Sequence, residues 1–197
     1  MNARVVMLAG ASGSGKTSLC RRLGLPVLTL DNFYRDGDDP ALPRRFGTVD
    51  WDDAACWDAG AAVATIERLC LGGGSADVPV YDIPSSRRTG TARLDLAGAA
   101  LFVAEGIFAA EAVAACVGLG VLADAICLQL HPAVTFGRRL LRDLAESRKP
   151  PLTLLRRGWG LARAEPELVR RWTAQGCRAL PVAEAERSIR ALVIRPS

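Results

Sequence analysis

Lysine and histidine are nearly absent from this chain of 197 residues. The 25 basic residues include only two lysines, Lys16 and Lys149, and the single histidine is His131. The six cysteines are scattered, with no C-x-x-C pair. Together these scarcities leave no spacing of the kind that binds zinc. We therefore expect neither a metal cluster of this kind nor a disulfide framework, and we expect most cysteines to be small core residues in a reducing compartment.

Long apolar runs are also missing. The longest, from Ala97 to Ala104, is far too short to span a bilayer, and Val5 to Ala9 is too short for the core of a signal peptide. We predict a soluble, cytoplasmic protein with no membrane partner. Half of the residues are hydrophobic, which excludes disorder, and the length predicts one domain over residues 1–197.

A glycine-rich motif follows the first apolar run. Residues 10–17 read G-A-S-G-S-G-K-T and fit G-x-x-x-x-G-K-[ST], a loop that binds phosphate between a strand and a helix. Glycines let the backbone N–H groups converge on phosphate oxygens, and the helix dipole adds positive charge. Lys16 supplies a charge for the terminal phosphates, and the Thr17 hydroxyl can ligate Mg²⁺. The predicted nucleotide-binding residues here are Gly10, Ala11, Ser12, Gly13, Ser14, Gly15, Lys16, Thr17 and Ser18.

Strand and helix patterns alternate along the chain. Buried strands are predicted at about 4–9, 27–30, 99–104, 123–130 and 191–194, and helices at about 16–23, 55–71, 109–117, from 132, and 152–177. Residues 77–83 and 91–96 predict a β-hairpin with residues 85–90 at its tip. This order indicates an α/β fold of the P-loop NTPase type, with a mostly parallel sheet flanked by helices.

Acidic residues stand at two predicted strand ends. Asp31 follows the strand at 27–30, and Glu105 follows the strand at 99–104. Ligands of such folds bind beyond the carboxyl ends of the strands, where an uncompensated charge is costly. Either residue alone could be a turn or capping residue. Their joint placement with Thr17 indicates Mg²⁺ binding or acid–base chemistry.

Several motifs, in this order, resemble those of uridine kinases and the related phosphoribulokinase-like and pantothenate-kinase-like P-loop kinases. They are residues 10–17, D-N-F-Y at 31–34, V-D-W-D at 49–52, P-V-Y-D at 79–82, E-G-I at 105–107 and R-R-L-L-R-D at 138–143. The resemblance covers about residues 4–150. It implies an ATP-dependent phosphotransferase with Mg²⁺, a hairpin at about 77–96 and a basic helical lid at about 147–160.

The resemblance also implies residue roles. Asp31 matches the catalytic base that takes the proton of a nucleoside 5′-hydroxyl and lies near the metal, with Lys16 as its catalytic partner on the phosphates. Thr17 and Glu105 match the magnesium ligands. Asp52 and Arg142 match the residues that hold the ribose hydroxyls, while Tyr81, and with it Tyr34, belongs to the acceptor site. Arg139 and Arg148 would face the phosphates.

The residues that would read the base depart from the family pattern. Ser86 or a neighbour replaces a histidine, Trp51 and Ile83 stand where phenylalanines are common, and Ser147 replaces a lid arginine. The sequence therefore supports a kinase better than it supports uridine as the acceptor, and pantothenate, a sugar phosphate or another nucleoside stays open. A homo-oligomer also stays open.

Two functions from other classes have weaker support in the sequence. A GTP-dependent switch or regulator would need an N-K-x-D guanine reader, and neither lysine has that setting. A nucleic-acid-binding ATPase would use the arginine-rich stretch at 138–178, which lacks interleaved aromatic residues for base stacking. We expect the partners to be ATP and a small hydroxylated acceptor rather than nucleic acid.

Overall fold

The computed structural model describes residues 2–45, 47–129 and 166–194. The predicted helix from residue 132, the lid at about 147–160, and Arg139, Arg142 and Arg148 lie outside these residues. In the described part, no helix is long and apolar enough to cross a membrane.

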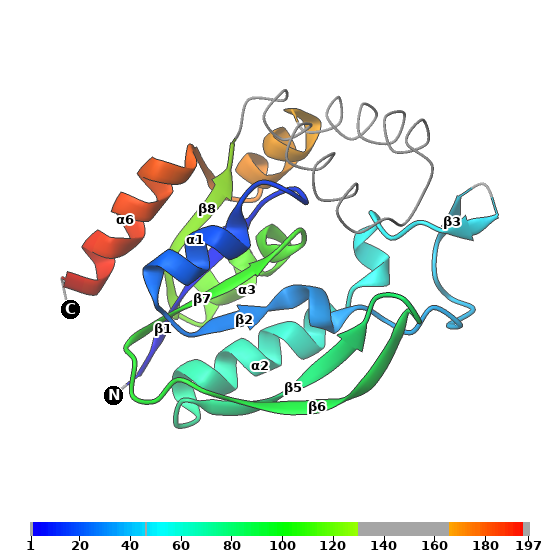
Figure 1. The fold of residues 1–197 in the computed structure, drawn as a ribbon, viewed down its shortest axis with the longest axis horizontal. Coiled ribbons are helices and arrows are strands. Elements are labelled where there is room, and N and C mark those ends of the chain that lie inside the picture. The colour runs from blue at the N-terminus through cyan, green and yellow to red at the C-terminus, as the bar shows by residue number, and fades with distance from the viewer. Residues whose placement is uncertain (1, 46, 130–165, 195–197) are drawn as a thin grey trace.

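The centre of the fold is a five-stranded sheet whose neighbouring strands are all parallel (Figure 1). This confirms the predicted mostly parallel sheet. In sheet order, the strands are β2 (Val27–Thr29), β7 (Leu101–Gly106), β1 (Arg4–Ala9), β8 (Leu122–Leu128) and β9 (Arg178–Leu180).

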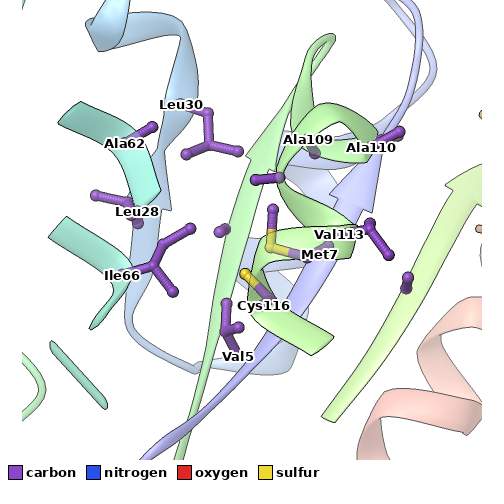
Figure 2. Close-up of a cluster of buried hydrophobic side chains, with 14 of the residues drawn as sticks. Val5, Met7, Leu28, Leu30, Ala62, Ile66, Ala109, Ala110, Val113 and Cys116 are labelled. Carbon is purple, nitrogen blue, oxygen red and sulfur yellow. The ribbon is translucent and has the colours of Figure 1, made fainter. Parts of the chain in front are cut away.

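Both faces of the sheet are buried, and successive residues of β1 point to opposite faces. Val5 and Met7 belong to a cluster that includes side chains of α2 (Ala59–Leu71), η3 (Ala109–Ala112) and α3 (Val113–Gly118), as Figure 2 shows. Val6 and Leu8 belong to a second cluster with side chains of α1 (Lys16–Leu23) and α6 (Val182–Ile194). All six cysteines are free and buried, which confirms the prediction that they are core residues.

Strand register brings the predicted site to one edge of the sheet. Glu105 of β7 lies opposite Leu8 of β1 and Thr29 of β2, and Gly106 lies opposite Ala9. The loop that follows β1 and the 3₁₀ helix η1 (Leu30–Phe33) that follows β2 therefore begin beside the end of β7. Leu30, predicted as strand, is already the first residue of this 3₁₀ helix.

The segment between η1 and α2 contains short elements. They are β3 (Arg44–Arg45), β4 (Thr48–Val49) and η2 (Ala54–Cys56). The α-helix predicted from residue 55 begins at Ala59, because the Asp58 side chain caps it by accepting from the N–H of Ala61 at 3.0 Å.

The predicted hairpin is confirmed, with a shorter tip. β5 (Ser75–Asp82) and β6 (Arg87–Asp95) pair antiparallel, so residues 87–90 belong to the ladder and only 83–86 form the turn. Asp82 closes this turn by accepting from the N–H of Ser85 at 3.0 Å. Ser86 takes a positive φ of 52°. The glycine and serine residues at 85–90 favoured a longer turn, but the pairing of Arg87 and Arg88 with β5 decides the ladder.

The last predicted strand is wrong. Residues 191–194 end helix α6, and the last strand is β9 just before it. The buried residues of α6 are Ala185 and Ile189, four apart, which is helical spacing, and the side chain of Glu186 accepts from Arg190 at 3.0 Å one turn later. The short run A-L-V-I was too short to distinguish a strand from a final helical turn. The chain before β9 is helical at 166–174 and turns at 175–176.

Candidate active site

The loop between β1 and α1 has the backbone of a phosphate cradle. Gly13 and Gly15 have φ of 81° and 93°, a region that side chains with a Cβ disfavour, and Gly15 is the N-cap of α1. The first N–H groups of an α-helix have no partner within the helix. They therefore face the loop together with the positive end of the α1 dipole, an arrangement that attracts an anion.

Two side chains fill the base of this loop. Lys16 Nζ donates to the carbonyl oxygens of Gly10 at 2.7 Å and Ala11 at 3.4 Å. Ser14 is buried, and its Oγ has no hydrogen-bond partner among the residues that the structure describes. A Cβ on Gly10 would lie 2.6 Å from that Oγ, so only glycine leaves room for it. An unpaired buried hydroxyl in an N–H-rich loop matches what a phosphate oxygen would need.

Glu105, Asp31 and Lys16 meet beside the loop. Glu105 is 8% exposed, and its Oε2 lies 3.9 Å from Lys16 Nζ. Burial raises the pKa of Glu105, the nearby charge of Asp31 raises it further, and Lys16 opposes both. Burial also raises the pKa of Asp31, against the lowering effects of Lys16 and of the backbone N–H of Ile107. One lysine thus balances two acidic groups at the edge of the sheet.

The carboxylate of Asp31 packs directly over Gly106. A Cβ at Gly106 would lie 2.9 Å from Asp31 Oδ1 and 2.9 Å from Leu30 Cβ, closer than real Cβ contacts. No side chain can therefore be added at Gly106 without displacing Asp31 or the start of η1.

We expect Gly106→Ala to lower kcat/KM by about tenfold or more, since a shift of about 1 Å at a reacting group is costly. Gly90→Ala is the matched control, because a Cβ there meets nothing within 4 Å. Steady-state kinetics of both variants test this. Equal activity of Gly106→Ala and wild type would show that the contact with Asp31 does not matter.

Aromatic rings line the neighbouring surface. Tyr34 contacts Trp51, Tyr81 and Phe108, with ring centroids 5.6, 5.7 and 5.8 Å apart. Its hydroxyl donates to the Trp51 carbonyl at 3.3 Å. Burial is the main cause that raises the pKa of Tyr34, and the charges of Asp31 and Asp52 add to it. Of the predicted acceptor residues, Asp52 is exposed, whereas Tyr34 and Tyr81 are partly buried and their rings contact each other.

Residues of the predicted site line two cavities. One of about 390 Å³ is lined by both Thr17 and Glu105, which the sequence predicted as magnesium ligands. The other, of about 620 Å³, lies at the hairpin tip and is lined by Trp51, Ser86 and Arg44 among others. Among the residues that the structure describes, no group of three or more His, Cys, Asp or Glu side chains is arranged to hold a metal ion.

Sequence reasoning missed residues that hold the site in place. Trp57 Nε1 donates to the Leu30 carbonyl at 2.8 Å, and Trp172 Nε1 donates to the Ile107 carbonyl at 3.1 Å. Arg88 of the hairpin reaches the carbonyls of Phe33 and Tyr34. A tryptophan or arginine in a sequence gives no signal of such long-range partners. Their positions at the ends of predicted strands brought Asp31, Glu105, Lys16 and Thr17 into one prediction, and the fold brings them to one edge of the sheet.

The chain is similar in sequence and fold to known proteins. No family model matches the chain. A uridine kinase from Deinococcus deserti is 36% identical over 160 residues, which cover 77% of this chain and 73% of that protein. The chain belongs to the uridine kinase family. Membership of the uridine kinase family and the P-loop support a kinase, that is, a phosphotransferase that binds a nucleotide.

The chain is also similar to proteins that carry other names. Inorganic pyrophosphatase TTM2 of Arabidopsis thaliana is 28% identical over 160 residues, but the match covers 75% of this chain and only 21% of that protein. A solved structure from Silicibacter sp. TM1040, assigned as a fructose transport system kinase, superposes with a TM-score of 0.64 at 19% identity. The superposition covers 91% of this chain and 90% of the Silicibacter chain. This likeness supports the fold.

Proposed function

We propose that this protein transfers the γ-phosphoryl group of ATP to a hydroxyl of a small molecule, with the 5′-hydroxyl of a nucleoside such as uridine or cytidine as the acceptor. The observation that carries the proposal is the position of Asp31. Its carboxylate packs on Gly106 at the end of β7, where Glu105 and Lys16 flank the phosphate loop. A base in this place can orient and deprotonate an alcohol next to a bound phosphate.

In this proposal the loop residues 10–18 hold the phosphates of ATP, and Lys16 neutralises charge that spreads over the moving phosphoryl group. The oxygen of the acceptor alcohol forms a bond to the γ-phosphorus as the bond from that phosphorus to the bridging oxygen breaks. The alcohol proton goes to Asp31, and ADP leaves. The protein contributes mainly by positioning the two substrates and by neutralising charge, because the transfer forms no covalent bond to the protein.

Mg²⁺ fits the residues proposed for it. Thr17 and Glu105 line the same cavity, and Asp31 lies beside Glu105, so the donors would be a hydroxyl and carboxylate oxygens. Magnesium prefers oxygen ligands and is held by one or two carboxylates together with substrate phosphates. When bound, it would neutralise phosphate charge. Burial raises the pKa values of Asp31 and Glu105, and a bound cation would compensate the negative charge of these two buried acids.

The acceptor side is proposed to include Tyr34, Tyr81 and Asp52. Arg142, together with Arg139 and Arg148 on the phosphate side, lies outside the described residues and keeps its predicted role as part of the proposal. The hairpin-tip cavity carries Ser86 and Trp51, two positions that differ from the family pattern. This difference favours, as a second candidate, the same phosphoryl transfer to another hydroxylated acceptor, namely pantothenate, a sugar phosphate or a different nucleoside.

A screen of ADP release tests the proposal. The full chain is mixed with ATP and Mg²⁺ and offered nucleosides, pantothenate, fructose and sugar phosphates one at a time. We expect acceptor-dependent ADP release that is strongest with a nucleoside. Release with only a different acceptor class would establish the second candidate. No acceptor-dependent release with any of them would contradict the kinase proposal as a whole.

A further inference from the structure

We propose that Arg88 is a positioning residue for the acceptor side of the site. Its side chain holds the end of η1 in place by binding the backbone carbonyls of Phe33 and Tyr34. This inference rests on the proposed function. It assigns the hairpin a second task, because the sequence pattern and the family resemblance gave the hairpin only Tyr81 and the base-reading positions.

The contacts of Arg88 converge on one segment. Its Nε donates to the carbonyl of Tyr34 at 3.1 Å, and its Nη2 donates to the carbonyl of Phe33 at 3.4 Å. The same Nη2 lies 3.3 Å from Asp58 Oδ2, at the cap of α2. The backbone N–H of Arg88 donates to Asp36 Oδ1 at 2.7 Å. One residue of β6 thus ties the hairpin to η1, to the following turn and to α2.

These contacts fix the 3₁₀ helix that carries Asp31. At its start, the Leu30 carbonyl accepts from Trp57 Nε1 at 2.8 Å. At its end, the Phe33 carbonyl accepts from the N–H of Asp58 at 2.9 Å as well as from Arg88. Asp31 stands between the two anchored carbonyls, in the first turn. A displacement at the Phe33 end would therefore shift the Asp31 carboxylate away from its position over Gly106.

Arg88 differs from the other ion-paired arginines of the hairpin. Arg87 with Asp38 and Arg93 with Asp77 are pairs in which every side chain is about 60% exposed, and exposed pairs contribute little to stability. The Arg88 side chain is 35% exposed, and two of its acceptors are backbone carbonyls. A planar guanidinium can serve two carbonyls and a carboxylate at once, which an ammonium group on a flexible stem cannot do in the same geometry.

Other contacts also attach the hairpin to the segment that follows η1. The hairpin also meets this segment through Tyr81 Oη, which donates to the Arg35 carbonyl at 3.2 Å, and through the N–H of Gly37, which donates to the Ser86 carbonyl at 2.7 Å. Both lie farther along the chain from Asp31 than the Phe33 and Tyr34 carbonyls that the Arg88 side chain binds. Loss of Arg88 should therefore loosen residues 30–36 while the hairpin stays attached at its tip.

Three variants of the full chain test this: Arg88→Ala, Arg88→Lys and, as the matched control, Arg93→Ala on the same strand. Amide hydrogen exchange is followed by mass spectrometry, ATP binding by calorimetry, and transfer to the acceptor found in the ADP-release screen by steady-state kinetics. For Arg88→Ala we expect faster exchange over residues 30–36 and unchanged exchange in α1. We expect kcat for the acceptor to fall about tenfold or more with a rise in KM, and the Kd for ATP to stay within about twofold.

Arg88→Lys should recover stability but only a small part of kcat, and Arg93→Ala should match wild type in every readout. Unchanged exchange over residues 30–36 in both Arg88 variants would overturn the proposal. So would a loss of ATP affinity as large as the loss of acceptor turnover, since that pattern indicates general damage. If wild type transfers phosphate to no acceptor, the proposed function fails, and the exchange data still decide whether Arg88 holds the segment that carries Asp31.

Discussion

Asp31→Asn is expected to lower turnover by about a hundredfold or more, the usual scale for loss of a general base, while the Kd for ATP stays within about twofold. The amide keeps the size of the side chain and its place over Gly106, but it cannot take a proton from the acceptor. The measurement is the steady-state kcat at saturating ATP and acceptor, with ATP binding measured separately. Near-normal turnover would remove Asp31 from its proposed role.

Stability of the same variant provides a control for folding. Burial raises the pKa of Asp31 in the folded protein, so its contribution to stability is present below the unfolded pKa and is lost as the pH rises through the folded pKa. At neutral pH the ionised carboxylate therefore costs stability when no ligand is bound. We expect Asp31→Asn to have a higher Tm than wild type at pH 7–8, with a difference that disappears below about pH 4. An inactive variant with a lower Tm at all pH values would instead indicate misfolding.

Lys16→Gln is expected to reduce kcat/KM by about 10²–10³, because it removes the charge that faces the phosphates in a partly buried site. Unlike Asp31→Asn, it should also weaken ATP binding. In the structure Lys16 bridges the Gly10 carbonyl and the edge of Glu105, so the loss affects the loop and the acids together. ATP titration and kinetics of the variant, with Arg21→Gln in the next turn of α1 as a control, measure both effects.

The pH dependence separates this variant from a simple loss of contact. Lys16 lowers the pKa of both Asp31 and Glu105, so its removal raises both further. An acidic group whose pKa is raised in the folded protein lowers the stability of that protein as the pH rises. The Tm deficit of Lys16→Gln should therefore be larger at pH 8 than at pH 5. A deficit that is constant with pH would contradict the electrostatic role of Lys16 between the two acids.

Much of the fold could be predicted from local signals. The apolar strands at 4–9 and 99–104, the glycine-rich loop and the hairpin gave clear local patterns. The structure confirms the first strand and the hairpin, and it places the second strand at Leu101–Gly106, so that Glu105 lies within the strand and not after it. The prediction was wrong where short apolar runs carry no period. Residues 191–194 finish a helix, and β9 was missed because three residues beginning with an exposed arginine do not look like a strand.

The candidate site also has features that local sequence signals predict and features that they do not. Asp31 and Glu105 could be brought together from sequence, because the carboxyl ends of parallel strands meet at one edge of a sheet. The 3.9 Å approach of Lys16 to Glu105, the packing of Asp31 on Gly106 and the anchors from Trp57 and Arg88 depend on contacts between distant segments. No local pattern encodes those distances. The catalytic and binding roles of these residues remain predictions.

The most direct test of the account follows the transferred phosphorus itself. Wild-type protein is incubated with ATP, Mg²⁺ and the acceptor found in the ADP-release screen, and the products are observed by ³¹P nuclear magnetic resonance. The account predicts that a phosphate monoester resonance, coupled to the protons of the acceptor carbon, grows in step with ADP. Accumulation of inorganic phosphate in step with ADP, without a monoester, would show that the site hydrolyses ATP and does not present an alcohol to it.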